Sequence, residues 1–307
     1  MVGQHTIAGE FSIAGIGVHS GIAATVAIRP AAAGTGRVVR RGPMGRLVPA
    51  HASEVSQTEL CTVLGEGADS VGTVEHLLAA LHGLGVDNAV IEVDGPEMPI
   101  LDGSARDFVA AIDEVGVVAQ HSPRRALKVL RPIRIEMGAS SGELAPHDGG
   151  LRLEVEIDFP HPVIGRQALV VDLSPDSFRR ELMAARTFGF LKDVERLTAA
   201  GRGRGASLDN TVVLDDQRVL NQAGLRAPDE FVRHKMLDAV GDLSLAGLPL
   251  VGRYRSVCGS HRLNVAVVKA LLADRSAWTV VEQPTRGRVV RADYVAGLQP
   301  ALAPEID

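Results

Sequence analysis

The chain has 307 residues and 46% of them are hydrophobic, which is enough for one large core or two of ordinary size and excludes a disordered chain. Its formal net charge of −5 argues against a general nucleic-acid binder, although a local basic patch can still hold a phosphate. The two cysteines, Cys61 and Cys258, have no CxxC spacing, which excludes a disulfide framework and a cysteine-rich zinc finger.

The chain carries no sign of export or membrane insertion. Its start, MVGQHTIAGEF, lacks the basic and apolar regions of a signal peptide, and no apolar run reaches the roughly 18 residues that span a bilayer. Together with the sparse cysteines, this predicts a cytoplasmic protein with no integral membrane segment.

In the first half, the chain is predicted to form a helix, a strand and a boundary. Thr73 can cap a helix that runs through His76 and stops at Gly85. The β-branched run at 88–93 follows as a short strand. The segment 120–125, QHSPRR, separates a helical stretch from a new run of strands and is the best candidate domain boundary.

The second half mixes strands and a long helix. Apolar and polar residues alternate over 151–159, which is the period of a half-buried strand, and 168–173 and 211–214 are shorter runs of the same kind. A helix is predicted to open at 228–230 and to end near Gly247. Strands and helices mix without a strict βαβ rhythm, which favours an α+β fold over a doubly wound sheet.

Two glycine-rich stretches do not indicate a nucleotide cofactor. GIGVHSG (15–21) and GRGRG (201–205) lack the strand–GxGxxG–helix context of a dinucleotide site, and no Walker lysine follows either of them. We interpret GRGRG as a loop.

Two short segments hold residues that suit metal chemistry. His234, Asp238 and Asp242 are spaced four apart on a predicted helix, so they share one face, and Glu75-His76 opens the earlier helix. Taken alone, His-x-x-x-Asp is more often a hydrogen-bonded pair than a metal site. Together the segments offer two imidazoles and one carboxylate, which is the ligand set of a catalytic zinc.

A proton donor and acceptor are also available. Glu75, next to a candidate ligand, is a natural general base for a water activated by the metal. His261, in a predicted Gly/Ser loop, can protonate a leaving amine, with Asp242 orienting it and raising its pKa. A lone loop histidine is as often simply exposed.

Over nearly its whole length the chain resembles the UDP-3-O-acyl-N-acetylglucosamine deacetylases. The matching segments are GIGVHSG (15–21), TVEHLLAALHGLGVDNAVIEVDGPEMPILDGSA (73–105), ARTFGF (185–190), LDNTVVLDD (208–216), RVLNQAGLR (218–226) and DEFVRHKMLDAVGDL (229–243). Several such motifs in the same order make the resemblance specific.

The resemblance implies a set of catalytic residues. The zinc ligands of the family fall on His76, His234 and Asp238. Its general base falls on Glu75, and its general acid falls on His261 with Asp242 behind it. Thr187, in ARTFGF, matches the hydroxyl that helps to hold the acetyl oxygen as it becomes an oxyanion.

The resemblance also implies substrate contacts. Lys235 matches a lysine placed toward the sugar, Phe188 and Phe190 match the edge of the acyl-chain passage, and His19 matches a histidine near the cleft. Without the motifs, Thr187 would be a turn cap, the two phenylalanines ordinary core and Lys235 a solvated charge.

The fold implied by the resemblance has two similar α+β domains, 1–122 and 123–307, with helices packed between two sheets and a small insertion in each. The second insertion, at about 188–213, would form the acyl passage. One departure concerns the diphosphate: Ala145 stands where many relatives have a lysine, so the contact is absent or comes from Arg202 and Arg204.

The function implied is zinc-dependent hydrolysis of the N-acetyl group of UDP-3-O-(3-hydroxyacyl)-N-acetylglucosamine, an early committed step of lipid A biosynthesis, by a cytoplasmic enzyme expected to be a monomer. Fe²⁺ in place of Zn²⁺ remains open, because a two-His, one-carboxylate set suits both ions. Two alternatives remain open: an amidohydrolase acting on a different acylated amine, and a non-catalytic, metal-stabilised binding protein.

Overall fold

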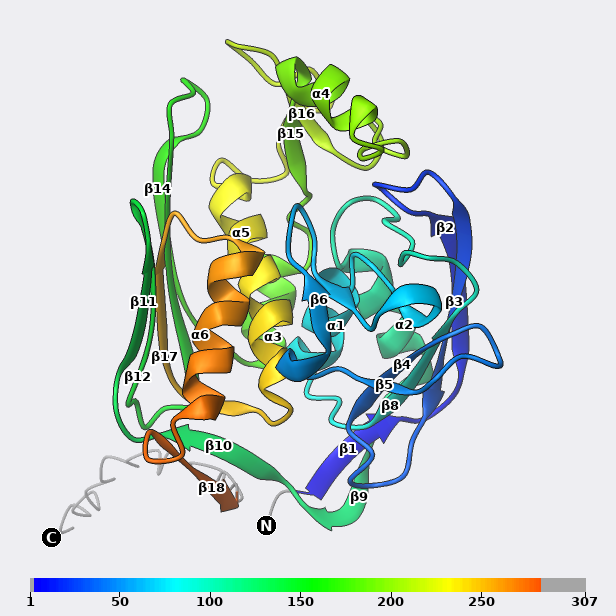
Figure 1. Cartoon of the computed structure of the whole chain (residues 1–307), viewed down its shortest axis with the longest axis vertical. Helices are drawn as coiled ribbons and strands as arrows, with labels where there is room; N and C mark the ends of the chain where they lie inside the picture. Colours follow the sequence, from blue (N-terminus) through cyan, green and yellow to red (C-terminus); the bar gives the residue numbers. More distant parts are fainter. Residues whose placement is uncertain (1–2, 283–307) are drawn as a thin grey trace, which may run out of the picture.

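The structure, a computed structural model, describes residues 3–282. In this part of the chain two sheets face each other and the main helices lie between them, as Figure 1 shows. This is the predicted α+β fold. The end of the second predicted domain, 283–307, lies outside the described residues. Within 3–282, no helix combines the length and the apolar character that a membrane crossing requires.

The sheet of the first half has the order β2-β3-β8-β4-β5. Its strands are β2 (Phe11–Ile16), β3 (Ala23–Pro30), β8 (Ala89–Val93), β4 (Arg37–Arg41) and β5 (Val48–Pro49). Ala24, Val26 and Ile28 of β3 are buried, while the residues between them are exposed or half-buried. One face of the sheet therefore packs inward against helices.

The sheet of the second half has the order β11-β12-β17-β10-β18, with β13 paired to β17 and β14 paired to β13. The strands are β10 (Arg125–Val129), β11 (Ile133–Met137), β12 (Ser140–Ala145), β13 (Leu151–Phe159), β14 (Gly165–Asp172), β17 (Leu250–Val257) and β18 (Trp278–Glu282). The alternation predicted for 151–159 is confirmed, because β13 has these bounds and buries every second residue over most of its length.

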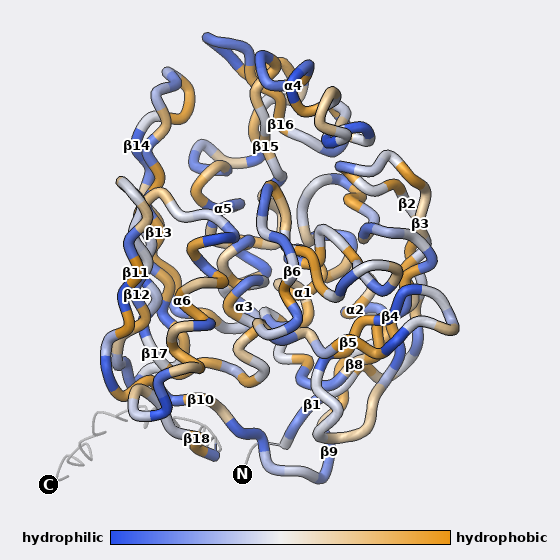
Figure 2. The backbone as a smooth tube through the Cα atoms, viewed as in Figure 1, coloured by the Kyte–Doolittle hydropathy of each residue, from blue (hydrophilic) through white to orange (hydrophobic). Residues whose placement is uncertain are grey.

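The helices between the sheets are α1 (Glu75–Gly83), α2 (Arg106–Val115), α5 (Glu230–Leu243) and α6 (His261–Ala273), with the short α3 (Pro175–Ser177) beside them. Every residue of α1 is buried, and α1 packs directly against α5. Figure 2 shows hydrophobic colouring along α1 and α6 in the interior, while much of the outer surface is hydrophilic. Polar residues on α1 and α5 are therefore held inside the core, where each needs a partner.

The start of α1 differs from the prediction. Thr73 does not cap the helix, because its backbone has φ 54° and its hydroxyl donates instead to Oε1 of Glu97 at 2.7 Å. Val74 is the N-cap residue and makes no side-chain capping bond. The helix also ends at Gly83, slightly before the predicted stop at Gly85.

The long helix α5 begins at Glu230, as predicted, and ends at Leu243. A 3-10 turn over Ser244–Ala246 follows, and Gly247 closes it with φ 82°, the left-handed conformation that glycine adopts readily. At the other end, the Glu230 carboxylate accepts hydrogen bonds from the side chain of Arg186 and from the backbone N–H groups of Arg186 and Arg226. This buried pair joins the ARTFGF segment to the start of α5.

The predicted insertion forms a separate small layer. It consists of β15 (Phe188–Phe190), a 3-10 turn (Leu191–Asp193), α4 (Val194–Ala199) and β16 (Val212–Leu214), with β15 and β16 paired in parallel. It lies above the ends of the two sheets in Figure 1. GRGRG belongs to neither helix nor strand, as expected of a loop.

The predicted boundary at 120–125 is more regular than its composition indicates. β9 (Val117–Pro123) runs through most of it and pairs with β1 (Gly3–Ile7), while β10 begins at Arg125. A further two-stranded sheet, β6 (Val55–Gln57) with β7 (Val63–Leu64), carries a loop that reaches α1 and α5.

A buried arginine connects the first sheet to the ends of both central helices. The guanidinium of Arg37, on β4, lies 3.2 Å from Nδ1 of His82 in the last turn of α1 and donates to the carbonyl oxygen of Ser244 at 2.9 Å, just after α5. The negative ends of the two helix dipoles balance its charge. Burial and the neighbouring Arg37 hold the pKa of His82 well below its usual value of 6.5.

We expect this histidine to make the fold acid-sensitive. Below about pH 6.5 the unfolded chain binds a proton at His82 that the folded chain does not, so the free energy of unfolding falls as the pH falls. His82→Gln keeps an acceptor for Arg37 and cannot titrate. In denaturant titrations between pH 7 and pH 5, wild type should lose up to about 1.4 kcal/mol more per pH unit than the variant. Parallel losses would contradict this account.

Candidate metal centre and active site

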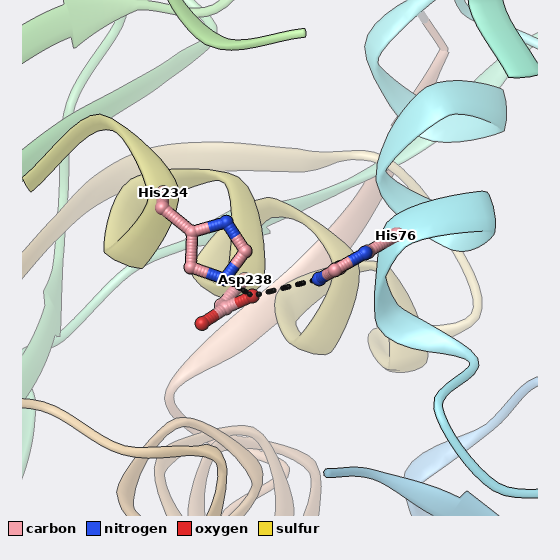
Figure 3. A group of neighbouring side chains, drawn as sticks. All are labelled: His76, His234 and Asp238. Carbon is pink, nitrogen blue, oxygen red and sulfur yellow. Dashed lines mark ion pairs between the residues drawn. The ribbon is translucent and has the colours of Figure 1, made fainter. Parts of the chain in front are cut away.

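Three buried side chains able to bind a metal converge between α1 and α5 (Figure 3). His76 lies in the first turn of α1, and His234 and Asp238 lie one turn apart on α5. The Nε2 atoms of His76 and His234 are 3.5 Å and 3.4 Å from Oδ1 of Asp238. All three ligand atoms lie within 4.8 Å of one another, so one ion can contact all of them.

The state of these side chains fits a bound cation. Burial lowers the pKa of His234 to about 3, so its imidazole is neutral. Its Nδ1 lies 3.1 Å from the carbonyl oxygen of Ala185, which favours a proton there and leaves the Nε2 lone pair facing Asp238. Oδ1 of Asp238 is buried and has no hydrogen-bond partner among the described residues, and a carboxylate oxygen in that position calls for a cation.

The spacing also fits a small divalent ion. Ligand atoms about 2.0–2.1 Å from one tetrahedral ion lie roughly 3.3–3.4 Å apart, close to the two separations at Asp238 Oδ1. Two imidazoles and one carboxylate suit zinc and ferrous iron alike. The residues thus fit a metal without fixing which one.

Glu75 and His261 lie next to the candidate metal ligands and next to each other. Oε1 of Glu75 is 3.6 Å from Nε2 of His261, and both side chains are buried. Burial raises the pKa of Glu75 above its usual range. Burial alone would lower the pKa of His261, but the charges of Asp242 and Glu75 outweigh it and raise that pKa to about 10. The site therefore holds a carboxyl group with a raised pKa, Glu75, beside a protonated imidazole, His261.

His261 is not the loop residue that the sequence predicted. It is the first residue of α6, and the Ser260 hydroxyl caps that helix by accepting a hydrogen bond from the backbone N–H of Leu263. Cys258, which precedes this turn, has φ 49°, so the chain bends sharply before the helix begins. The side chain of His261 is 7% exposed, which rules out the exposed-loop interpretation.

Asp242 accepts hydrogen bonds from three side chains, one of which is His261. Its Oδ2 accepts from Nδ1 of His261 at 2.9 Å and from the amide of Asn264 at 2.8 Å. Its Oδ1 accepts from the hydroxyl of Thr62 at 2.6 Å. The hydroxyl of Tyr254 donates in turn to Oδ1 of Asn264 at 2.6 Å. Three donors satisfy this fully buried carboxylate, and the bond to Nδ1 orients the imidazole of His261.

Comparison with known proteins gives the family. The model of the UDP-3-O-acyl N-acetylglycosamine deacetylase family matches residues 4–273. The chain belongs to this deacetylase family. Proteins named UDP-3-O-acyl-N-acetylglucosamine deacetylase in Brucella ovis and Brucella canis are each 51% identical to it over 282 residues, covering 91% of this chain and 98% of theirs. The resemblance found in the motifs is therefore confirmed.

Two further residues are expected from the deacetylase motifs, and one of them, Lys235, contacts the candidate metal cluster. Nζ of Lys235 is 3.1 Å from Oδ2 of Asp238, which leaves Oδ1 to the two histidines. Thr187 follows Ala185, the acceptor for His234, by two residues. Its backbone N–H donates to the carbonyl oxygen of Gly103 and its own carbonyl accepts from Val212, so the main chain fixes its position.

The two phenylalanines have different aromatic neighbours. Phe188 makes edge contacts with the rings of Phe231 and His234, at centroid distances of 5.0 Å and 6.2 Å. Phe190 lies against Phe159 and His161. Both side chains are half-buried, so each keeps an exposed portion at the base of the insertion.

His19 is held in place by a carboxylate that the sequence did not single out as functional. Glu97, within PEMPILDG, is 4% exposed and accepts from the backbone N–H groups of His19 and Ser20 as well as from Thr73. Glu97 therefore joins the GIGVHSG loop to Thr73, in the segment that leads into α1. An acidic residue enclosed by prolines in an apolar loop is the signal that could have identified it.

The residues considered for the diphosphate lie in different surroundings. Ala145 is buried at the end of β12, where it pairs with Arg253, so its side chain faces no cleft. Arg202 donates to the side chain of Gln57, and Arg204 lies against Gly21 with its backbone N–H donating to His19. GRGRG thus packs on GIGVHSG.

Removing one histidine of the cluster should remove the metal. We expect His234→Ala to lose at least most of the bound metal, measured by elemental analysis after dialysis, because two remaining ligands hold a divalent ion weakly. His121→Ala, at an exposed position on β9, is the matched control and should keep the wild-type metal content. Equal metal in both variants would exclude His234 from the ligand set.

Proposed function

We propose that this chain hydrolyses the N-acetyl group of UDP-3-O-(3-hydroxyacyl)-N-acetylglucosamine, releasing acetate and the free amine as an early step of lipid A biosynthesis. Its membership of the deacetylase family supports this, and one structural observation carries it: a buried His76–His234–Asp238 cluster adjoins a Glu75–His261 pair. A metal-dependent amidohydrolase needs such a set of metal-binding side chains with a general acid and a general base beside it.

The metal is proposed to be zinc, with ferrous iron as the alternative that the same ligands allow. When bound, it supplies a positive charge that polarises the amide carbonyl and makes a neighbouring water easier to deprotonate. His76, His234 and Asp238 would hold it. Lys235 neutralises the second oxygen of Asp238, so the carboxylate offers one oxygen to the site.

Proton transfer falls to Glu75 and His261. Glu75 takes the proton of the attacking water; its raised pKa makes it a better base than an ordinary carboxylate. His261, held protonated by Asp242, gives its proton to the leaving glucosamine nitrogen. Thr187 donates to the acetyl oxygen as charge develops on it.

The remaining contacts are assigned to the substrate. Lys235 faces the sugar, Phe188 and Phe190 border the acyl-chain passage in the insertion, and His19 lies near the cleft. Arg202 and Arg204 are the candidates for the diphosphate, since Ala145 is buried. Aromatic edges at the base of the insertion suit a fatty chain, because they offer apolar surface that is only half covered.

The domains are proposed to be 1–122 and 123–307, with the protein acting as a monomer in the cytoplasm. The candidate metal ligands and the Glu75–His261–Asp242 set contact one another within one copy of the chain, which supports a site that needs no second copy. Both cysteines are free, which suits a reducing compartment.

Acetate release from the acylated UDP-sugar tests the function. The proposal predicts turnover of the 3-O-acylated substrate and a large loss with plain UDP-N-acetylglucosamine, which lacks the chain that the passage binds. Equal rates on both would favour an amidohydrolase for a different acylated amine. No acetate in a single-turnover assay of the metal-loaded protein would favour a non-catalytic binding protein.

The assignment of the base has its own test. Glu75→Gln should keep the wild-type metal content and lower kcat by about 10²–10⁴-fold, because the amide cannot accept the proton of water. Glu59→Gln, at an exposed position, is the matched control and should keep wild-type kcat. Full activity in Glu75→Gln with its metal retained would assign the base elsewhere.

A further inference from the structure

Thr62 makes three contacts that join the parts of the acid–base pair. It lies in the loop between β6 and β7 and is fully buried. Its backbone N–H donates to Oε2 of Glu75 at 3.0 Å, and its carbonyl accepts from the N–H of Val74 at 3.4 Å. The peptide groups of this residue therefore hold the start of α1 and the carboxylate of the proposed base.

The side chain of Thr62 reaches the other half of the chain. Its hydroxyl donates to Oδ1 of Asp242 at 2.6 Å, a short hydrogen bond to a fully buried carboxylate. Hydrogen bonds to carboxylate oxygens are among the stronger ones in proteins. Among the described residues, Thr62 is the hydrogen-bond donor to Oδ1, since His261 and Asn264 both bond to Oδ2.

The position of His261 depends on this arrangement. Asp242 can orient the imidazole only if its own carboxylate plane is fixed, and fixing a plane takes contacts at both oxygens. Asn264 and His261 hold one oxygen, and Thr62 holds the other. Thr62 also donates to Glu75, so one residue positions both the proposed base and Asp242, the carboxylate that orients the proposed acid.

We propose that Thr62 is a positioning residue for the deacetylation reaction: it fixes Glu75 through its backbone and His261 through Asp242. This inference rests on the proposed function, because it assumes that Glu75 takes a proton from water and that His261 gives one to the leaving nitrogen. The side-chain hydroxyl of Thr62 bonds to Asp242 and to neither Glu75 nor His261. Its hydroxyl acts through Asp242, and small displacements of such groups can cost about 10²-fold in rate.

The test begins with Thr62→Val, which removes the hydroxyl and keeps the shape. It should lower kcat about 10–100-fold and leave KM within about twofold, because binding contacts are unchanged. Thr62→Ser restores the hydroxyl and should recover most of kcat. Metal content should equal that of wild type in both variants, since no ligand is altered.

A matched control separates positioning from simple loss of a buried hydrogen bond. Thr6 is also a buried threonine, and its hydroxyl donates to the carbonyl oxygen of Asn88 at 2.7 Å, far from α5. Thr6→Val should lower thermal stability as Thr62→Val does and leave kcat unchanged. A serine variant as inactive as Thr62→Val, or a Thr62→Val enzyme with wild-type kcat, overturns the proposal.

A double-mutant cycle identifies the route through Asp242. If Thr62 acts through that carboxylate, adding Thr62→Val to Asp242→Ala, which leaves no acceptor for the hydroxyl, should change kcat by less than about twofold. The full 10–100-fold loss in the Asp242→Ala background overturns the proposal. The same cycle measured by thermal unfolding is independent of catalysis. If wild type releases no acetate, the proposed function fails, and additive unfolding effects would separately refute the Thr62–Asp242 coupling.

Discussion

The backbones of α1 and α5 approach each other closely where Gly241 faces Glu75. A Cβ atom built on Gly241 would lie 2.2 Å from the carbonyl oxygen of Glu75. This is too close for any side chain, so the position requires glycine, which has no Cβ atom. This approach brings the first turn of α1 beside the middle of α5. His76 then meets His234 and Asp238, and Glu75 meets His261. A larger residue at 241 would move the two helices apart and separate the ligands.

Packing the helices so closely places ionisable groups in the core, and the structure compensates each of them differently. The Asp242 carboxylate has three hydrogen-bond donors, and Glu230 pairs with Arg186 and two backbone N–H groups. Asp238 is the exception, since Lys235 satisfies Oδ2 while Oδ1 faces two imidazole nitrogens. A buried site that is complete except for one positive charge is what a metal centre requires.

Much of this could be predicted from the sequence, because the relevant signals are local. The alternation at 151–159 and the start of α5 at Glu230 follow from side-chain periodicity and from the preference of Pro and acidic residues for helix starts. His234 and Asp238 share a face because of their spacing. The residue types suggested His76 as a third ligand and the family resemblance assigned it, but no local pattern in the chain encodes the contact between α1 and α5 that brings it to that face.

The errors and omissions arise from tertiary contacts. Thr73 looked like a helix cap, but the buried Glu97 takes its hydroxyl and the backbone bends to φ 54°. His261 looked like a loop residue, because the glycine and serine before it hide a capped helix start. Thr62 gave no signal at all. A threonine in a short loop is common, and its importance appears only when α5 brings Asp242 to it.

The site takes its residues from both halves of the chain. The first half supplies His76, Glu75 and Thr62, and the second supplies His234, Asp238, Asp242 and His261. Neither half can assemble a metal site or an acid–base pair alone. Arg37 joins the far ends of α1 and α5, while the Glu75–Gly241 contact and Thr62 join them near the proposed catalytic groups. The interface between the halves is therefore the functional unit, and contacts that hold it together also set the geometry of the chemistry.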